Sequence, residues 1–78
     1  MKTLIYLFFN TPTASEMRFD LGSAYSFVIK KTAKEYVLHW DGHSDDLVTV
    51  TYNSNTADEV ASLFIKTVEV VVGQRLNP

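Results

Sequence analysis

The chain has 78 residues, of which 46% are hydrophobic and 21% charged, and its formal net charge is −2 at pH 7. This length predicts one domain, residues 1–78, and the composition is typical of a folded chain rather than a disordered one. The absence of cysteine excludes disulfide bonds, cysteine catalysis and thiolate metal sites. The negative charge argues against a general nucleic-acid binder, because such proteins usually carry a basic stripe.

The most apolar run of the chain covers residues 4–9. It is too short to cross a bilayer, which takes about 20 residues as a helix. Its aromatic and β-branched content favours a strand over residues 3–9. Ile5, Leu7 and Phe9 would then share one face, and both faces would be apolar. We therefore expect a second layer on this strand, from the same chain, a second copy or a partner.

The same run could instead be the apolar region of a secretory leader, with Lys2 before it and small residues at 13–15 after it. An apolar region this short lies at the lower limit of the usual length. We therefore expect a cytoplasmic protein without a membrane segment, in the producing cell or in a host cell, rather than an exported one.

Two interpretations of residues 10–21 remain open after the turn chemistry of residues 10–12. Thr13 and Glu16 have the spacing of a capping box, which would open a short helical turn. Residues 17–21 alternate apolar and polar, as an edge strand does. We favour the strand, followed by a turn at residues 22–23.

A hairpin is predicted from residues 24–32 and 35–41, joined by a two-residue loop. The cross-strand pairs of this register are Phe27 with Trp40, Ile29 with Leu38, and Lys31 with Tyr36. One face then collects large aromatic and aliphatic side chains, which stabilise sheets as cross-strand pairs. A third strand at 46–52 adds Val48 and Val50 to that face.

A helix is predicted between Thr56 and Gly73, after a break in the sheet at residues 53–55. Thr56 and Glu59 form a second capping box, and Gly73 is suited to end the helix. The apolar stripe consists of Ala57, Val60, Ala61, Phe64, Val68 and Val71. Leu63 and Val70 widen it, which suggests a further contact through the helix. Residues 67–72 are rich in β-branched side chains, so helix or strand remains open there.

Together these elements predict an α+β fold, an antiparallel sheet of four to five short strands with one C-terminal helix packed on one face. The order of the strands stays open, because residues 10–23 are long enough to cross the sheet.

His39, Asp41 and His43 are the candidates for a metal site, since imidazole and carboxylate can bind a transition metal. Such a site would need the strand to continue through Gly42, whereas an Asp-Gly pair favours a turn. We therefore expect polar turn residues here, with no cofactor, no catalytic site and no enzymatic activity.

A metal-dependent function at the turn of His39, Asp41 and His43 is the second alternative to the leading hypothesis, and the first alternative is a single-stranded nucleic-acid-binding domain. Its bases would stack on the aromatic residues Tyr25, Phe27, Tyr36 and Trp40. Its phosphates would meet the only basic cluster, Lys30, Lys31 and Lys34. The same aromatic residues are also what a helix would cover as a core, and we favour the core.

The leading hypothesis is a non-catalytic protein-interaction protein that forms a homodimer. We expect a small inhibitor or regulator of microbial or phage type, which occludes or bridges a larger partner protein. The candidate contact residues are Ile5, Leu7, Phe9, Val28, Lys30, Val37, His39, Thr49, Thr51, Leu63 and Val70.

Overall fold

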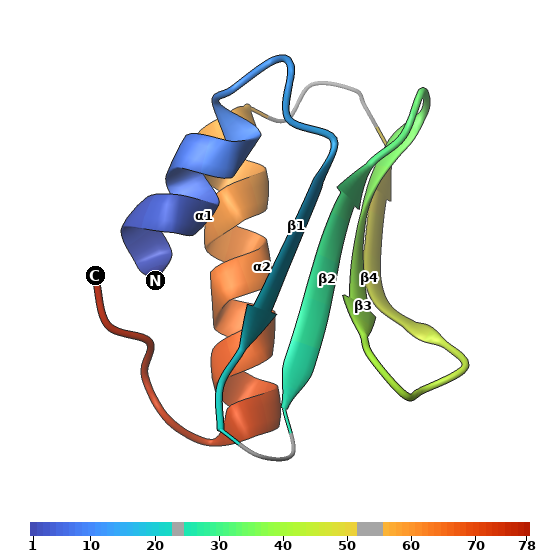
Figure 1. The fold of residues 1–78 in the computed structure, drawn as a ribbon. Helices are drawn as coiled ribbons and strands as arrows, with labels where there is room; N and C mark the ends of the chain where they lie inside the picture. The colour runs from blue at the N-terminus through green and yellow to red at the C-terminus, as the bar shows by residue number, and fades with distance from the viewer. Residues whose placement is uncertain (23–24, 52–55) are drawn as a thin grey trace.

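A computed structural model describes residues 1–22, 25–51 and 56–78. The elements in chain order are α1 (Lys2–Phe9), β1 (Glu16–Asp20), β2 (Ser26–Lys31), β3 (Glu35–Trp40), β4 (Asp46–Thr51) and α2 (Ala57–Val72). The strands form one antiparallel sheet in the order β1-β2-β3-β4, and both helices lie on the same side of it (Figure 1). The predicted α+β fold is confirmed, with four strands and an additional N-terminal helix.

The N-terminal segment is helical, so the strand predicted over residues 3–9 is wrong. Ile5, Phe8 and Phe9 are its buried residues, at the spacing of three and four that one helix face requires. An unbroken apolar run has no period of its own, so its sequence does not distinguish helix from strand. As a helix the segment forms backbone hydrogen bonds within itself, and its buried side chains pack in the core against the sheet.

The segment after α1 is extended, which confirms the strand interpretation. β1 pairs with β2 in the register that sets Glu16 opposite Lys30 and Phe19 opposite Phe27. Glu16 therefore belongs to a strand rather than to a capping box with Thr13. The strand order, left open by the sequence, is a simple meander.

The β2–β3 hairpin has the predicted register. Its pairs include Phe27 with Trp40, Ile29 with Leu38, and Lys31 with Tyr36. The Thr32 N–H donates to the Glu35 carbonyl at 2.9 Å and closes the two-residue loop. β4 continues the same face, with Val48 opposite Leu38, and a bulge follows between Leu38 and His39.

The boundaries of α2 agree with its predicted caps. The Thr56 hydroxyl accepts from the Glu59 N–H, and the Glu59 carboxylate accepts from the Thr56 N–H, both at 3.2 Å. Gly73 ends the helix at φ +80°, a left-handed conformation that glycine adopts without strain. Residues 67–72 are helical, because their apolar side chains meet the core at helical spacing.

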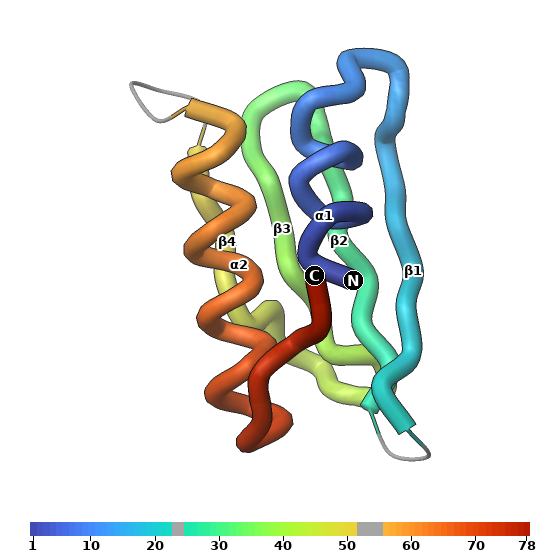
Figure 2. Tube along the Cα trace, turned by 90° about the vertical axis from the view of Figure 1, so that its left-hand side faces the viewer, coloured from blue at the N-terminus to red at the C-terminus, as the bar shows by residue number. Residues whose placement is uncertain are grey.

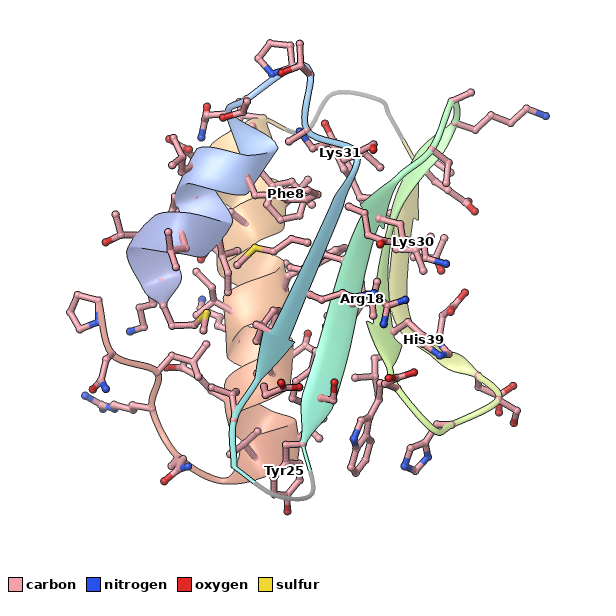
Figure 3. The ribbon with its side chains drawn as sticks, in the orientation of Figure 1. Phe8, Arg18, Tyr25, Lys30, Lys31 and His39 are labelled. Carbon is pink, nitrogen blue, oxygen red and sulfur yellow. The ribbon has the colours of Figure 1, made fainter. Side chains whose placement is uncertain are left out.

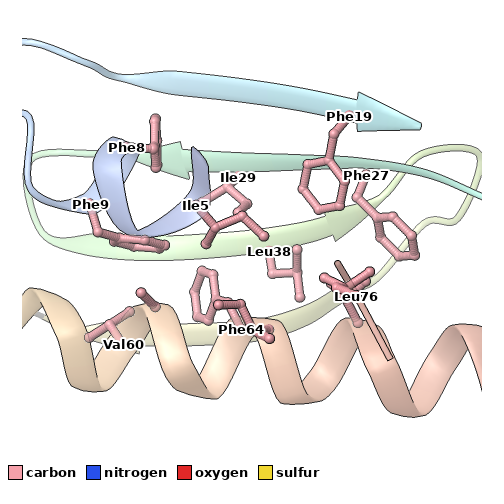
Figure 4. Close-up of a cluster of buried hydrophobic side chains, with 13 residues drawn as sticks. Ile5, Phe8, Phe9, Phe19, Phe27, Ile29, Leu38, Val60, Phe64 and Leu76 are labelled. Atoms are coloured by element: carbon pink, nitrogen blue, oxygen red, sulfur yellow. The ribbon is translucent and has the colours of Figure 1, made fainter. Parts of the chain in front are cut away.

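The core lies between the sheet and the two helices (Figure 4). α1 and α2 run side by side over the sheet, with α2 on the β4 side (Figure 2). The ring of Phe9 meets that of Phe64 edge-on, 5.3 Å between centroids, and joins the helices. The largest fully buried side chains are Phe27, Phe64, Ile5, Ile29 and Leu38.

Three predictions fall wholly or partly outside the described residues. They are the turn at residues 22–23, the sheet break at residues 53–55, and the strand ends at residues 24 and 52. Of these, only Gly22 is described, and its φ of +89° is compatible with a tight turn.

Candidate protein-binding surfaces

The three candidate metal ligands are not brought together. His39 lies on the sheet face away from the helices, where its Nδ1 is 3.1 Å from the Asp46 carboxylate. His43 stacks on Trp40, with 3.9 Å between ring centroids and 21° between ring planes. Within residues 1–22, 25–51 and 56–78, no group of three or more His, Asp or Glu side chains could hold a metal ion.

The aromatic residues considered as a base-stacking platform lie on the sheet face that the helices cover. Phe27 has no exposed surface, and Tyr25 stacks on Trp40 at 5.7 Å between centroids. Tyr36 meets the ring of Phe9 at 5.1 Å. These side chains therefore serve the core, as the hairpin pattern predicted.

The basic cluster is divided by the fold. Lys31 points to the helix side, where its Nζ lies 2.8 Å from the Thr11 carbonyl and 4.6 Å from the centre of the Phe8 ring. Burial lowers the pKa of Lys31. Lys30 points to the opposite face of the sheet, so the two neighbouring lysines do not form one phosphate-binding surface.

The sheet face without helices, called the open sheet face here, is mixed in charge. Its side chains come from Glu16, Arg18, Val28, Lys30, Val37, His39, Asp46, Thr49 and Thr51. Figure 3 shows Arg18, Lys30 and His39 on this face. The Arg18 guanidinium lies 3.4 Å from the Glu16 carboxylate and 3.9 Å from that of Asp41. Much of the positive charge is therefore paired with carboxylates.

Val28 and Val37 form the floor of the open sheet face. They are only 2% and 8% exposed, because longer side chains on neighbouring strands cover them. Arg18 and His39 flank Val28 in the register, and Lys30 lies opposite Val37. The prediction that these valines contact a partner directly is therefore wrong.

The first exposed apolar surface is on α1. Leu4 and Leu7 are 53% and 60% exposed and form what we call the α1 flank. Lys2 of α1 and Asn10, which follows the end of this helix, contact α2, so the α1 flank is turned away from α2.

The structure corrects the contact prediction for the N-terminal segment. Ile5 and Phe9 are buried in the core and cannot meet a partner, whereas Leu7 is exposed as expected. Leu4 was missed, because a strand places it on the face opposite Leu7. Helical spacing of three brings Leu4 and Leu7 together, and the spacing of Ile5, Phe8 and Phe9 could have revealed it.

The second exposed apolar surface is on α2. Leu63 and Val70 are 44% and 81% exposed and form what we call the α2 flank. Asp58 and Glu69 mark the side of α2 that meets α1, through Asn10 and Lys2 respectively. Leu63 lies away from that side, whereas Val70 lies on the outer face of α2 beside Lys66, Glu69 and Arg75, and both remain candidates for a contact.

Comparisons of the chain with known protein families, with curated proteins and with solved structures gave no match. Among the described helices, none has the length and apolar content needed to cross a membrane.

Proposed function

We propose that the protein is a non-catalytic protein-binding protein and acts as a homodimer. It is a small inhibitor or regulator of microbial or phage type, which occludes or bridges a larger partner protein. The observation that supports partner binding is the α1 flank, where Leu4 and Leu7 lie one turn apart and are each more than half exposed. Burying such a side chain contributes about 1.5–3 kcal/mol, and neighbouring exposed apolar side chains mark protein-contact sites.

The distribution of charge supports a protein partner over a nucleic acid. On the open sheet face, Arg18 and His39 each face a carboxylate. Lys31 is held against Phe8 and Thr11. A nucleic-acid binder needs several cations free to displace counterions from phosphates, and it stacks bases on exposed rings. Here the rings belong to the core.

The test is affinity capture with the chain tagged at its C-terminus through a flexible linker. The tagged protein is incubated with lysate of its native host, with and without nuclease. We expect a stoichiometric protein partner that survives nuclease treatment. The double variant Leu4→Ser/Leu7→Ser should reduce its recovery at least about tenfold, because each tenfold corresponds to about 1.4 kcal/mol.

The control is Val70→Ser, which removes an apolar side chain from the other helix that is more exposed than Leu4 or Leu7. It should leave recovery unchanged, and thermal unfolding of all variants checks that the fold is intact. Equal recovery by the Leu4→Ser/Leu7→Ser variant would contradict binding through the α1 flank. Recovery of nucleic acid alone, or of proteins lost with nuclease, would contradict the protein-binding function.

A further inference from the structure

The hydrogen bonds at the ends of the β2–β3 hairpin fix which backbone groups of β3 face β2. The Asp41 N–H donates to Ser26, and the Thr32 N–H donates to Glu35, both at 2.9 Å. In an antiparallel pair, opposite residues alternate between bonded and non-bonded. The odd-numbered residues of β3 therefore bond to β2, and the even-numbered residues bond to β4.

The same alternation identifies the outward groups of β4. Val48 and Val50 lie opposite the even-numbered residues of β3, so their backbone groups point inward. The N–H and C=O of Thr49 and Thr51 therefore point away from the sheet, and they have no backbone partner among the described residues. Residues 47–51 carry no charge. Edge strands that avoid pairing usually carry charges, prolines or bulges along that edge. In β4 the charge of Asp46 and the bulge both lie at the start of the strand, before Thr49.

α2 lies over β4, beside this edge, and carries Leu63 at a matching depth. α2 begins at the end of the molecule where β4 finishes (Figure 1). Leu63 is six residues into α2, which is about 9 Å at 1.5 Å per residue. Thr49 is two residues before the end of β4, about 7 Å at 3.3 Å per residue. The apolar side chain of Leu63 and the outward backbone groups of Thr49 therefore lie at a similar depth along the same edge of the molecule.

We propose that this combined surface binds a second copy of the chain, with the two β4 strands antiparallel about a two-fold axis beside Thr49. Thr49 would exchange two backbone hydrogen bonds with Thr49 of the other copy. The result is a continuous eight-stranded sheet with four helices on one face. This inference rests on the homodimer of the proposed function and assigns its interface.

The charges of α2 are complementary under this symmetry. Glu59 and Lys66 are both exposed and lie about one turn before and one turn after Leu63. A two-fold axis near Leu63 makes the two α2 helices antiparallel. It places Glu59 of each copy beside Lys66 of the other, and Leu63 beside Leu63. Such an isologous contact uses the same patch on both copies.

The spacing of the layers determines how the two copies would meet. Packed helices lie about 8–10 Å apart, and paired strands lie about 4.8 Å apart. α2 lies over β4 (Figure 2). Pairing of the two β4 strands would therefore bring the two α2 helices into direct contact across the axis.

The test measures dimer dissociation by sedimentation equilibrium across the micromolar range. Thr49→Pro removes one outward N–H and leaves the inward groups of Val48 and Val50 in place, as edge positions allow. It should weaken the dimer at least about tenfold. Arg18→Pro makes the same change on the outward side of β1 and should leave the dimer constant unchanged.

Two further variants keep the test decisive if Thr49→Pro does not fold. Thr49→Lys places like charges directly opposite each other on the two-fold axis and should also dissociate the dimer. Lys66→Glu sets Glu59 of one copy against a new carboxylate of the other, and a smaller loss is expected. A chain that is monomeric throughout, or a Thr49→Lys variant that dimerises as well as the original, would overturn the inference.

The outcomes separate this interface from the α1 flank. If Leu4→Ser/Leu7→Ser is monomeric while Thr49→Lys still dimerises, the α1 flank is the dimer interface and the inference is wrong. If Thr49→Lys is monomeric and still captures the partner protein, the β4 interface and partner binding are both supported and independent. A monomer that binds a different protein through the β4 edge would also overturn the second-copy assignment.

Discussion

The two edge strands of the sheet follow the same pairing alternation but carry different side chains, and the β3–β4 pairing contains a bulge at the start of β4. The outward residues of β1 are Glu16, Arg18 and Asp20, which are all charged and exposed. Those of β4 are Thr49 and Thr51, which are neutral. Charged side chains along an edge make addition of another strand costly, because they would lose water. One edge of this small sheet is therefore protected, and the other is open to pairing.

The two helices also differ from each other, and each lies over a different half of the sheet. Two side-chain contacts hold α1 in place: the Lys31 ammonium donates to the Thr11 carbonyl, and Lys2 pairs with Glu69. This helix carries the α1 flank on the β1 half of the molecule. α2 has a full capping box, lies over β4 and carries the α2 flank. The two proposals accordingly place partner binding on one half of the domain and the second copy on the other.

The largest expected effect comes from placing proline on the inward side of β4. Val50→Pro removes an N–H that bonds to β3 and leaves the β3 carbonyl without its donor, so we expect the free energy of unfolding to fall by about 1–3 kcal/mol. Thr49→Pro, one residue away, should cost much less. Urea denaturation measures the loss of stability of both variants, at protein concentrations low enough for every protein to be monomeric. Val50→Ala is the control for the lost side chain. Equal losses at the two positions would refute the assigned alternation.

An intermediate effect is expected when the charged outward residues of β1 are replaced by threonine, the residue found at the outward positions of β4. The triple variant Glu16→Thr/Arg18→Thr/Asp20→Thr removes the protecting charges from the outward residues of β1. With two open edges, each copy can extend the sheet in both directions, so light scattering should show assemblies larger than a dimer.

The control for this variant is Glu35→Thr. It changes the net charge by the same one unit but lies on β3, inside the sheet. It should leave the assembly size unchanged. A triple variant that scatters no more than the control would show that charge on β1 does not restrict pairing.

The structure of a segment could be predicted from the sequence where its apolar residues recur with the period of a strand or a helix. The β2–β3 register followed from alternation, because a shift by one residue would have moved Ile29 and Leu38 out of the core. The limits of α2 followed from Thr56 and Gly73, whose local chemistry is specific to helix ends. The run at residues 4–9 had no polar residue to set a period, and tertiary packing decided its structure.

The candidate surfaces were only partly foreseen, for a related reason. Leu63 and Val70 were identified because a helix pattern shows which side chains exceed the core stripe. The burial of Val28 and Val37 was not foreseeable, since it depends on which longer side chains lie opposite them in the register of the sheet. The pairing alternation of β4 likewise requires hydrogen bonds seen only in the structure.

The smallest expected effect is on the stability of the protein at acid pH. A hydrogen bond from the Leu76 N–H, helped by the Lys2 ammonium, lowers the pKa of Glu69 below its ordinary value of 4.5. The unfolded chain then binds this proton more readily, so Glu69 contributes stability above pH 4.5 that is lost as the pH falls through the lower folded pKa.

Glu69→Gln should therefore flatten the acid side of the stability curve and leave β4-mediated dimerisation intact. Denaturation midpoints measured against pH for both proteins check this, with Glu35→Gln as the control carboxylate outside the helices. An acid profile of Glu69→Gln that is identical to the original would contradict the pKa direction.

The stack of Trp40 on His43 has a practical consequence for following these events. The chain contains a single tryptophan, and its ring lies at the base of the hairpin that carries β4, 3.9 Å from the imidazole. The same ring also stacks on Tyr25 and on the buried Phe27. Its emission therefore reports on the β3–β4 turn and on the core face of the sheet together, so a change confined to the turn and a loss of the core are separated by comparing the original protein with His43→Ala, which removes only the turn contact.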